Sequence, residues 1–276
     1  MDTQIGRTPE AYMSAEINSK LIPSKSRIKL LSYNIQVGIA STRPHHYVTQ
    51  SWKHLYPHRK QYHNLNQIAA IVADYDIVGL QEVDAGSRRS KFTNQTEYLA
   101  IKAQFPYWSH QTNRRLGKIA QHSNGLLSKF DPLDIVDHKL PGRVPGRGAM
   151  VVRFGEESNP MIVVLLHLAL GRKARLAQLD YVSKLVQEYE HVVVMGDMNC
   201  QPESEEFQVL LNNVGLLAPA SDLNTFPSWN PTKKLDHILV TPSLIVENVS
   251  VVDVACSDHL PISMDIIIPE AIRLVA

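Results

Sequence analysis

The segment His191–Asn199, with the sequence HVVVMGDMN, constrains the fold more than any other stretch of the chain. Its three consecutive valines form a short, apolar, β-branched run, which is typical of a strand buried on both faces. Polar residues close the run, although Asp and Asn are poor strand formers and cost several kcal/mol when buried without partners. Two interpretations stay open on this segment alone. A glycine turn at Gly196 could present Asp197 and Asn199 to a metal ion, a water or a phosphate, or an Asx turn could cap a helix expected from Glu203.

Length and composition indicate a globular protein of one large domain or two small ones. The 276 residues are 44% hydrophobic and 20% charged, which excludes an intrinsically disordered chain. A formal net charge of +1 gives no global basic field, so tight binding of long DNA is disfavoured, although a nuclease is not excluded.

The sequence also favours a reducing compartment. The two cysteines, Cys200 and Cys256, do not make a disulfide framework. The N-terminus, MDTQIGRTPE, lacks the basic and apolar regions of a secretory signal. The apolar runs are also too short to span a bilayer. We therefore expect a cytoplasmic protein without a membrane span.

Short apolar runs outnumber the segments with helical periodicity. Strands are expected at 27–34, 76–81, 123–128, 133–138, 148–154, 161–167, 192–194, 234–241, 249–255 and 262–268, and helices at 61–75, 97–103, 172–189 and 203–211. No clear pattern follows Tyr107. The expected fold class is α/β (α+β), with two mainly antiparallel sheets packed face to face and helices outside. Residues 27–276 would form this domain and residues 1–26 an N-terminal arm.

A long loop, residues 38–61, follows the first expected strand and carries His45, His46, His54 and His58 among several aromatic residues. Loops of this length inside compact domains are usually functional or disordered, and the aromatic residues argue against disorder. Because the histidines lack the tight spacing of metal ligands, a folded surface lobe is favoured over a metal site. The lobe leaves a strand that ends in Asn34, so we expect it to contact substrate.

Polar side chains close one expected strand after another. They are Asn34, Glu82, His167, Asp197, Asn199, Asp258 and His259. Such a set predicts that one edge of the sandwich collects a site. Oxygen ligands without a cysteine cluster favour a hard cation such as Mg²⁺. A histidine beside a carboxylate suits proton transfer or stabilisation of charge on phosphate oxygens.

The order of seven short motifs resembles that of the endonuclease/exonuclease/phosphatase superfamily, which has the deoxyribonuclease I-like fold. The motifs are NIQVG, LQEVD, SNGLLS, LLHL, GDMN, LDHILV and SDHLPI, and the resemblance covers about residues 28–268. It implies a four-layered α/β sandwich. It also implies hydrolysis of a phosphate ester by in-line attack of water, with Mg²⁺, or Mn²⁺ as an alternative, neutralising developing charge.

The resemblance also implies a role for individual residues on the metal side. Glu82 of LQEVD is similar to the family's metal-binding glutamate, and Asn34 to the asparagine beside it. Asp258 of SDHLPI resembles a further metal-side carboxylate, acting directly or through water. The residues alone leave other roles open, because Glu82 could cap the turn that follows it and Asp258 could be a turn residue.

The same resemblance implies a catalytic set and a substrate-binding set. Asp197 is similar to the aspartate that orients or deprotonates the attacking water, and Asn199 to its partner on a phosphate oxygen. His259 resembles the histidine at the scissile phosphate, and Asp236 of LDHIL the carboxylate that orients it. The remaining assignments are His167, which holds phosphate or helps transfer a proton, and Asn124 and Arg147, which contact substrate.

Some of these residues could instead have a purely structural role. Asn124 could simply start a strand, and Arg147, in an RGAM segment similar to the RGAL of bacterial members, could form a surface salt bridge. His237 adjoins Asp236 but should point to the opposite side of the strand, so we interpret it as structural.

The motifs predict the chemistry and leave the substrate open. The family cuts DNA, RNA tails, sphingomyelin and inositol phosphates, so the leading hypothesis is a phosphodiesterase, nuclease or phosphatase, with nucleic acid among the candidate substrates. The alternatives are a phospholipid-headgroup (sphingomyelinase-like) hydrolase and a non-catalytic binding protein on the same fold. Basic residues cluster at 88–91, 114–115 and 172–173, where surface solvation is the favoured explanation. The sequence sets no oligomeric state.

Overall fold

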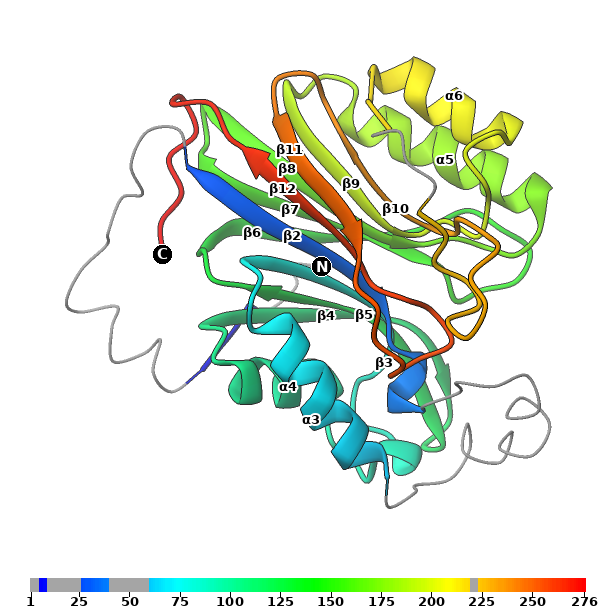
Figure 1. Ribbon diagram of the computed structural model, residues 1–276. Coiled ribbons are helices and arrows are strands. Elements are labelled where there is room, and N and C mark those ends of the chain that lie inside the picture. The colour runs from blue at the N-terminus through cyan, green and yellow to red at the C-terminus, as the bar shows by residue number, and fades with distance from the viewer. Residues whose placement is uncertain (1–4, 9–25, 40–59, 219–222) are drawn as a thin grey trace.

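The computed structural model describes residues 5–8, 26–39, 60–218 and 223–276. Most of the expected N-terminal arm, and residues 40–59 of the histidine- and aromatic-rich loop, lie outside the described residues. Figure 1 shows four layers, in which two sheets face each other and helices cover the outer face of each. The predicted fold class, a layered α/β sandwich, is confirmed.

Two mixed sheets form the two inner layers. The larger has the strand order β1 (Gly6–Arg7), β4 (Tyr107–Leu116), β5 (Ala120–Ser128), β3 (Ile77–Asp84), β2 (Arg27–Asn34), β12 (Ile262–Ile267) and β11 (Ile245–Val251). The smaller has the order β10 (Asp236–Val240), β9 (His191–Asp197), β8 (Asn159–His167), β7 (Gly148–Glu156) and β6 (Pro132–Lys139). Each sheet contains one parallel pair, β2 with β3 and β8 with β9, and its other pairs are antiparallel.

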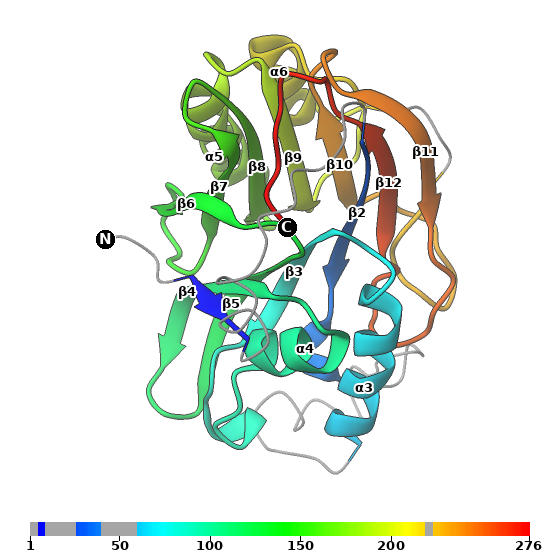
Figure 2. The same cartoon turned by 90° about the vertical axis from the view of Figure 1, so that its left-hand side faces the viewer.

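Helices cover the outer faces of the sheets (Figures 1 and 2). Helices α3 (Gln61–Val72) and α4 (Gln95–Ala103) pack on the larger sheet, and α5 (Arg172–Val186) and α6 (Glu205–Val214) on the smaller. Two short 3-10 turns, η1 (Gln36–Gly38) and η3 (Arg88–Ser90), follow β2 and β3. Within the described ranges, buried apolar side chains therefore form three separate cores, one between the sheets and one under each helical layer.

Strand β9 is buried along its whole length, as its valine run predicts. Val193 and Met195 pack in the core between the sheets. Val192 and Val194 point the other way and pack under α5 and α6. Because successive side chains of a strand alternate between its faces, only an apolar residue at every position satisfies both cores.

The register of the parallel pairs places the polar strand ends together. Asn34 pairs with Gln81, the residue before Glu82. In the other sheet His167 pairs with Asp197, and Asp236 pairs with Asp197 from the opposite side. The carboxyl ends of parallel strands lie at the same edge of a sheet. Polar residues that close separate strands in the sequence are therefore neighbours in the fold.

Three elements differ from expectation. Strand β4 was not predicted, because its sequence, YWSHQTNRRL, is mostly polar and pairing with β5 along nearly its whole length stabilises it. The strand expected at 249–255 is wrong in position, since β11 ends at Val251 and Asp258 lies in a bend beyond it. Strand β11 lies at the edge of the sheet and its residues are exposed or half-buried, so burial does not fix its bounds in the sequence. The helix expected from Glu203 begins at Glu205, with Ser204 as its N-cap residue.

Candidate active site

A glycine turn ends β9 and aims the side chain of Asp197. Gly196 has a φ of 148°, and a Cβ placed there would lie 1.9 Å from the carbonyl oxygen of Leu166 on β8. Only glycine lets the two backbones approach this closely. Asp197 Oδ1 then accepts a hydrogen bond of 2.9 Å from the backbone N–H of Asn199. This is an Asx turn, but it ends before α6 begins and so does not cap that helix.

Asn199 is also held in a defined position. Its φ of 51° lies in the left-handed region, which Asn tolerates better than most residues. Its Nδ2 donates to the backbone carbonyl of Leu168 at 3.0 Å. The turn therefore fixes the Asn199 carboxamide beside the Asp197 carboxylate.

The second oxygen of Asp197 faces three nitrogen atoms from three different segments. Asn34 Nδ2 donates to Asp197 Oδ2 at 3.1 Å, and His167 Nε2 lies 3.4 Å from the same oxygen. His259 Nε2 lies 3.8 Å away. Asp197 is only 2% exposed, and burial raises the pKa of its carboxyl group to about 7, against the lowering effect of the His259 charge. The Asp197 carboxylate, at the end of β9 in the smaller sheet, is thus hydrogen-bonded to Asn34 at the end of β2 in the larger sheet.

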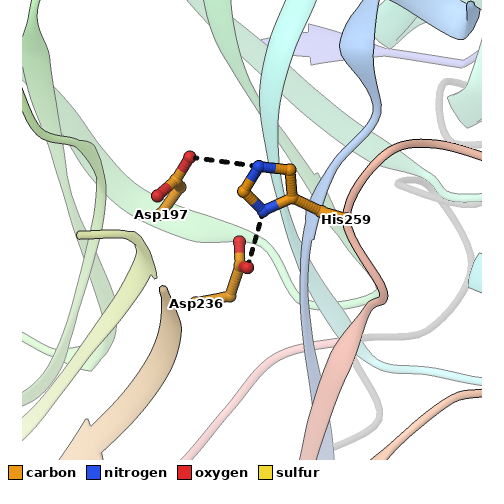
Figure 3. Close-up of side chains that lie close together, drawn as sticks. All are labelled: Asp197, Asp236 and His259. Carbon is orange, nitrogen blue, oxygen red and sulfur yellow. Dashed lines mark hydrogen bonds and ion pairs between the residues drawn. The ribbon is translucent and has the colours of Figure 1, made fainter. Parts of the chain in front are cut away.

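His259 is held between two carboxylates, as Figure 3 shows. Its Nδ1 is hydrogen-bonded to Asp236 Oδ2 at 2.8 Å, which leaves Nε2 directed toward Asp197. Thr225 Oγ1 donates to the same Asp236 oxygen at 2.6 Å. The ring of Phe226 packs against the imidazole with centroids 4.8 Å apart. These contacts fix the orientation of the imidazole.

The two histidines of the site have opposite charge preferences. Burial alone would lower the pKa of His259, but the charges of Asp236 and Asp197 outweigh it and raise that pKa to about 10. Burial lowers the pKa of His167 well below its usual range, and the nearby charge of Arg147 acts in the same direction. His259 is therefore an imidazolium and His167 a neutral imidazole at neutral pH. Groups whose pKa values are pushed apart in this way suit opposite roles in proton transfer.

Glu82 and Asp258 lie on the side of the site that is predicted to bind metal. Glu82 sits at an irregularity between β3 and β5 and has a φ of 55°, an uncommon value for glutamate. About a third of its side chain, 34%, is exposed, and its pKa is raised by burial and by the charge of Asp258. Such backbone strain is a common feature of functional sites.

Gln36, in the NIQVG motif, connects this pair to the rest of the site. Its Nε2 donates to Asp258 Oδ2 at 3.1 Å, and its backbone N–H donates to Asn34 Oδ1 at 3.2 Å. Its Oε1 is buried without a hydrogen-bond partner among the described residues. Gln36 thus places a buried acceptor next to Asp258, whose charge acts on Glu82, and this set of oxygen atoms fits a hydrated divalent cation.

A second group of potential ligands comprises Asp197, Asp236 and His259, whose nearest ligand atoms all lie within 4.8 Å of one another. Both ring nitrogens of His259 already face carboxylates in this group. The arrangement suits an oriented, charged histidine, whereas the oxygen-rich group around Glu82 matches the preference of Mg²⁺.

The two predicted substrate-binding residues line one cavity of about 820 Å³, together with Glu82 and His167. Asn124 donates to the backbone carbonyl of Gly148 at 3.2 Å, and its buried Oδ1 has no hydrogen-bond partner within the described ranges. Arg147 is half-buried. Burial lowers the pKa of its guanidinium, and the charges of Glu82 and Asp197 oppose that effect.

The structure thus places all ten predicted residues in one connected region. Two contributors were missed. Thr225 lies in a loop, TFPSWN, 11 residues before Asp236, and only the fold shows that it reaches that carboxylate. Gln36 belongs to a quoted motif, and the same polar-terminus signal that marked Asn34 could have marked it. His237 lies apart from the site, where its Nε2 contacts the Cys200 carbonyl oxygen at 3.0 Å.

Comparison with known families identifies the class of protein. Residues 31–259 match the model of the Endonuclease/Exonuclease/phosphatase family. The chain belongs to this family, and it is a hydrolase that acts on phosphoester bonds. Members of the family generally depend on divalent metal ions. A search of curated proteins finds no match.

Solved structures share the fold at low sequence identity. An endonuclease/exonuclease/phosphatase from Beutenbergia cavernae is 20% identical with a TM-score of 0.69, over 88% of this chain and 72% of that one. A mannosyl-6-phosphatase from Bacteroides thetaiotaomicron is 17% identical with a TM-score of 0.64, over 87% and 99%. The human Nocturnin catalytic domain with bound sulfate is 15% identical with a TM-score of 0.63, over 94% and 99%. These likenesses show the fold alone.

In the part of the chain that the structure describes, no helix is long and apolar enough to cross a membrane.

Proposed function

We propose that the protein is a Mg²⁺-dependent phosphodiesterase or phosphatase that hydrolyses its substrate by in-line attack of an activated water. The arrangement around Asp197 carries this proposal. A buried carboxylate that faces Asn34, His167 and His259 at 3.1, 3.4 and 3.8 Å has the surroundings of a group that handles a proton. The two buried free cysteines support a reducing, cytoplasmic setting.

In the proposed mechanism, the charge state of each residue determines its role. Asp197 orients the attacking water and accepts its proton, while the Asn199 carboxamide holds a phosphate oxygen. The imidazolium of His259, oriented by Asp236, stabilises negative charge on the phosphate, as preorganised donors do in other hydrolytic sites. The neutral His167 holds a phosphate oxygen or relays a proton, and Asn124 and Arg147 contact substrate.

Glu82 and Asp258 would hold the metal, with Asn34 beside them. When bound, Mg²⁺ or Mn²⁺ neutralises the charge that develops on the phosphate oxygens. Asn34 donates to Asp197 and accepts from the Gln36 backbone, so it keeps the metal-side carboxylates and the water-side carboxylate in a fixed relation.

Hydrolysis of bis-p-nitrophenyl phosphate tests this proposal. Wild type should release nitrophenol with Mg²⁺ and stop after chelation with EDTA. Glu82→Ala should abolish metal-dependent turnover, whereas Glu188→Ala, which removes an exposed acid of the same type far along the chain, should not. His259→Ala should lose more than about 2 kcal/mol of transition-state stabilisation, roughly 30-fold in rate.

Two outcomes would reject the proposal. Equal turnover by wild type and Glu82→Ala would contradict the metal assignment. A folded wild type that binds Mg²⁺ without hydrolysing phosphate esters would indicate a binding protein on this fold.

A further inference from the structure

The cavity beside the catalytic groups is too large for one phosphate group alone. Its volume of about 820 Å³ lies in the range of clefts that bind whole small molecules. Glu82 and His167 line one part of it. Other walls come from the end of β4, from β5, from the loop between β6 and β7, and from α5 with the loop before it. A bound ester therefore has room to extend well beyond its scissile bond.

The walls of this cavity carry an excess of positive charge. Arg114, Arg143 and Lys173 come from three different segments and line it together with Arg147. Among the described residues that line the cavity, Glu82 is the only one with a carboxylate. The first three cations form no ion pair within 4.0 Å with any residue that the structure describes.

A neighbouring arginine shows the contrast. Arg172 precedes Lys173 in the sequence but is paired with Glu205 and Glu206 on α6. In each of the two basic pairs of the sequence, 114–115 and 172–173, one residue lines the cavity and the other does not. Cations from separate segments that line one cavity and have no ion pair with a described residue are suited to bind an anion.

Two further groups in the lining fit an anionic ligand. Burial, with the charges of Arg89 and other arginines, lowers the pKa of His122 to about 4, so this side chain is neutral and adds no charge of its own. The unpartnered Oδ1 of Asn124 offers an acceptor to a hydroxyl or amino group of the same molecule.

The cavity also has an apolar part. Val144 is 72% exposed and Leu170 is 76% exposed, and the two lie on different loops that border the cavity. Pro145, Ala174 and Ala177 add further apolar surface. A small patch of exposed apolar residues next to cations suits an organic body that carries charged groups.

We propose that the substrate is a small organic phosphate ester with a second phosphate group, which Arg114, Arg143 and Lys173 bind while the scissile phosphate lies among the catalytic residues. The organic body between the two phosphates contacts Val144 and Leu170. A long nucleic acid is disfavoured, because the formal net charge is only +1 and the three cations line one cavity rather than an extended surface. This inference rests on the proposed function.

A matched pair of chromogenic esters tests the second phosphate. The p-nitrophenyl ester of thymidine 5′-phosphate is compared with the same ester bearing a 3′-phosphate, at low and constant ionic strength. Wild type should have a kcat/KM at least tenfold higher for the doubly phosphorylated ester. In the combined variant Arg114→Gln, Arg143→Gln, Lys173→Gln that preference should vanish, since the three side chains are exposed and each charge contact contributes a factor of roughly two to five, which together gives about tenfold or more.

Control variants remove cations that do not line the cavity. Arg115→Gln changes the next residue along β4, and Lys184→Gln changes the other end of α5. Both should keep the wild-type preference. Equal kcat/KM for the two esters in wild type, or a preference that survives removal of the three cavity cations, would overturn the inference.

A binding measurement separates this inference from the proposed function. Calorimetry with thymidine 3′,5′-bisphosphate and thymidine 5′-phosphate needs no turnover. Tighter binding of the bisphosphate, lost in the combined variant, would support the inference even if no ester were hydrolysed. Hydrolysis without any difference between the two ligands would support the proposed function and overturn the inference. A single-stranded oligonucleotide that outcompetes the bisphosphate would overturn the assignment of a small substrate.

Discussion

Replacing Gly196 with alanine should damage both stability and activity, and the structure allows the cost to be worked out. The new Cβ would lie 1.9 Å from the Leu166 carbonyl oxygen and 2.9 Å from its carbon, which are backbone atoms in a paired strand and cannot turn aside. Forcing extra atoms into a packed core costs about 1–3 kcal/mol. A φ of 148° adds strain of about 1–3 kcal/mol for any residue other than glycine. The expected loss is therefore about 2–6 kcal/mol.

Activity should fall further than stability alone requires. Asp197 follows directly, so relief of the clash moves its carboxylate away from His167 and His259. A displacement of about 1 Å costs on the order of a hundredfold in rate. Urea unfolding measures the stability, and kcat/KM for bis-p-nitrophenyl phosphate, on the fraction that is folded, measures the activity.

Gly215→Ala is the matched control. Gly215 also has a positive φ, of 71°, but a Cβ there would meet no atom within 4 Å. This variant should lose only the conformational part, about 1 kcal/mol, and keep its activity. If Gly196→Ala lost no more stability than Gly215→Ala, the close approach of β9 to β8 would not be the reason for the glycine.

Two further predictions concern a positioning residue and a buried ion pair. Thr225→Val removes the hydroxyl that donates to Asp236 and should lower kcat about tenfold or more with little change in KM, by loss of a hydrogen bond to a charged group. Thr225→Ser should restore kcat, and a Val variant with wild-type kcat would exclude the positioning role. Glu206→Gln should cost about 3–5 kcal/mol near neutral pH, because it leaves the buried pair with Arg175 broken. Burial alone would raise the pKa of Glu206, but hydrogen bonds and the charge of Arg175 lower it overall. The pair therefore stabilises the fold above the unfolded pKa of about 4.3. The difference in unfolding free energy between wild type and variant, measured in urea, should shrink as pH falls below that value. A difference that stays constant from pH 7 to pH 3 would contradict this linkage.

Much of the fold could be predicted because its strands carry strong local signals. The valines of β9 pack in an apolar core on each face of the sheet, so the run of apolar residues itself predicts a buried strand. The predicted site residues could be found because carboxylates, amides and histidines are anomalous at the ends of such runs. The edge strand β11 lacks this pressure, which is why its position was wrong. Strand β4 was missed because its sequence is mostly polar and its pairing with β5 stabilises it.

Other features depend on contacts between distant segments. Thr225 reaches Asp236 only after a loop folds back, and its hydroxyl looks ordinary in the sequence. Likewise Arg114 and Lys173 stand in basic pairs that resemble a solvated surface. Their meaning changes because the fold brings them to one cavity, while the acids of α6 neutralise Arg172 instead. Charge pairing of this kind cannot be read from sequence spacing.

The position of the site follows from where the fold uses parallel strands. Each sheet has one parallel pair, and such a pair presents two carboxyl ends at the same edge. In the larger sheet this edge brings Asn34 next to the strand that bears Glu82, and in the smaller sheet it brings His167 to Asp197. Packing the sheets face to face then closes the gap, with the 3.1 Å hydrogen bond from Asn34 to Asp197 joining the two edges. In the proposed mechanism the metal side thus belongs to one sheet and the water-activating side to the other, so the geometry of catalysis depends on the packing between the sheets as much as on any single strand.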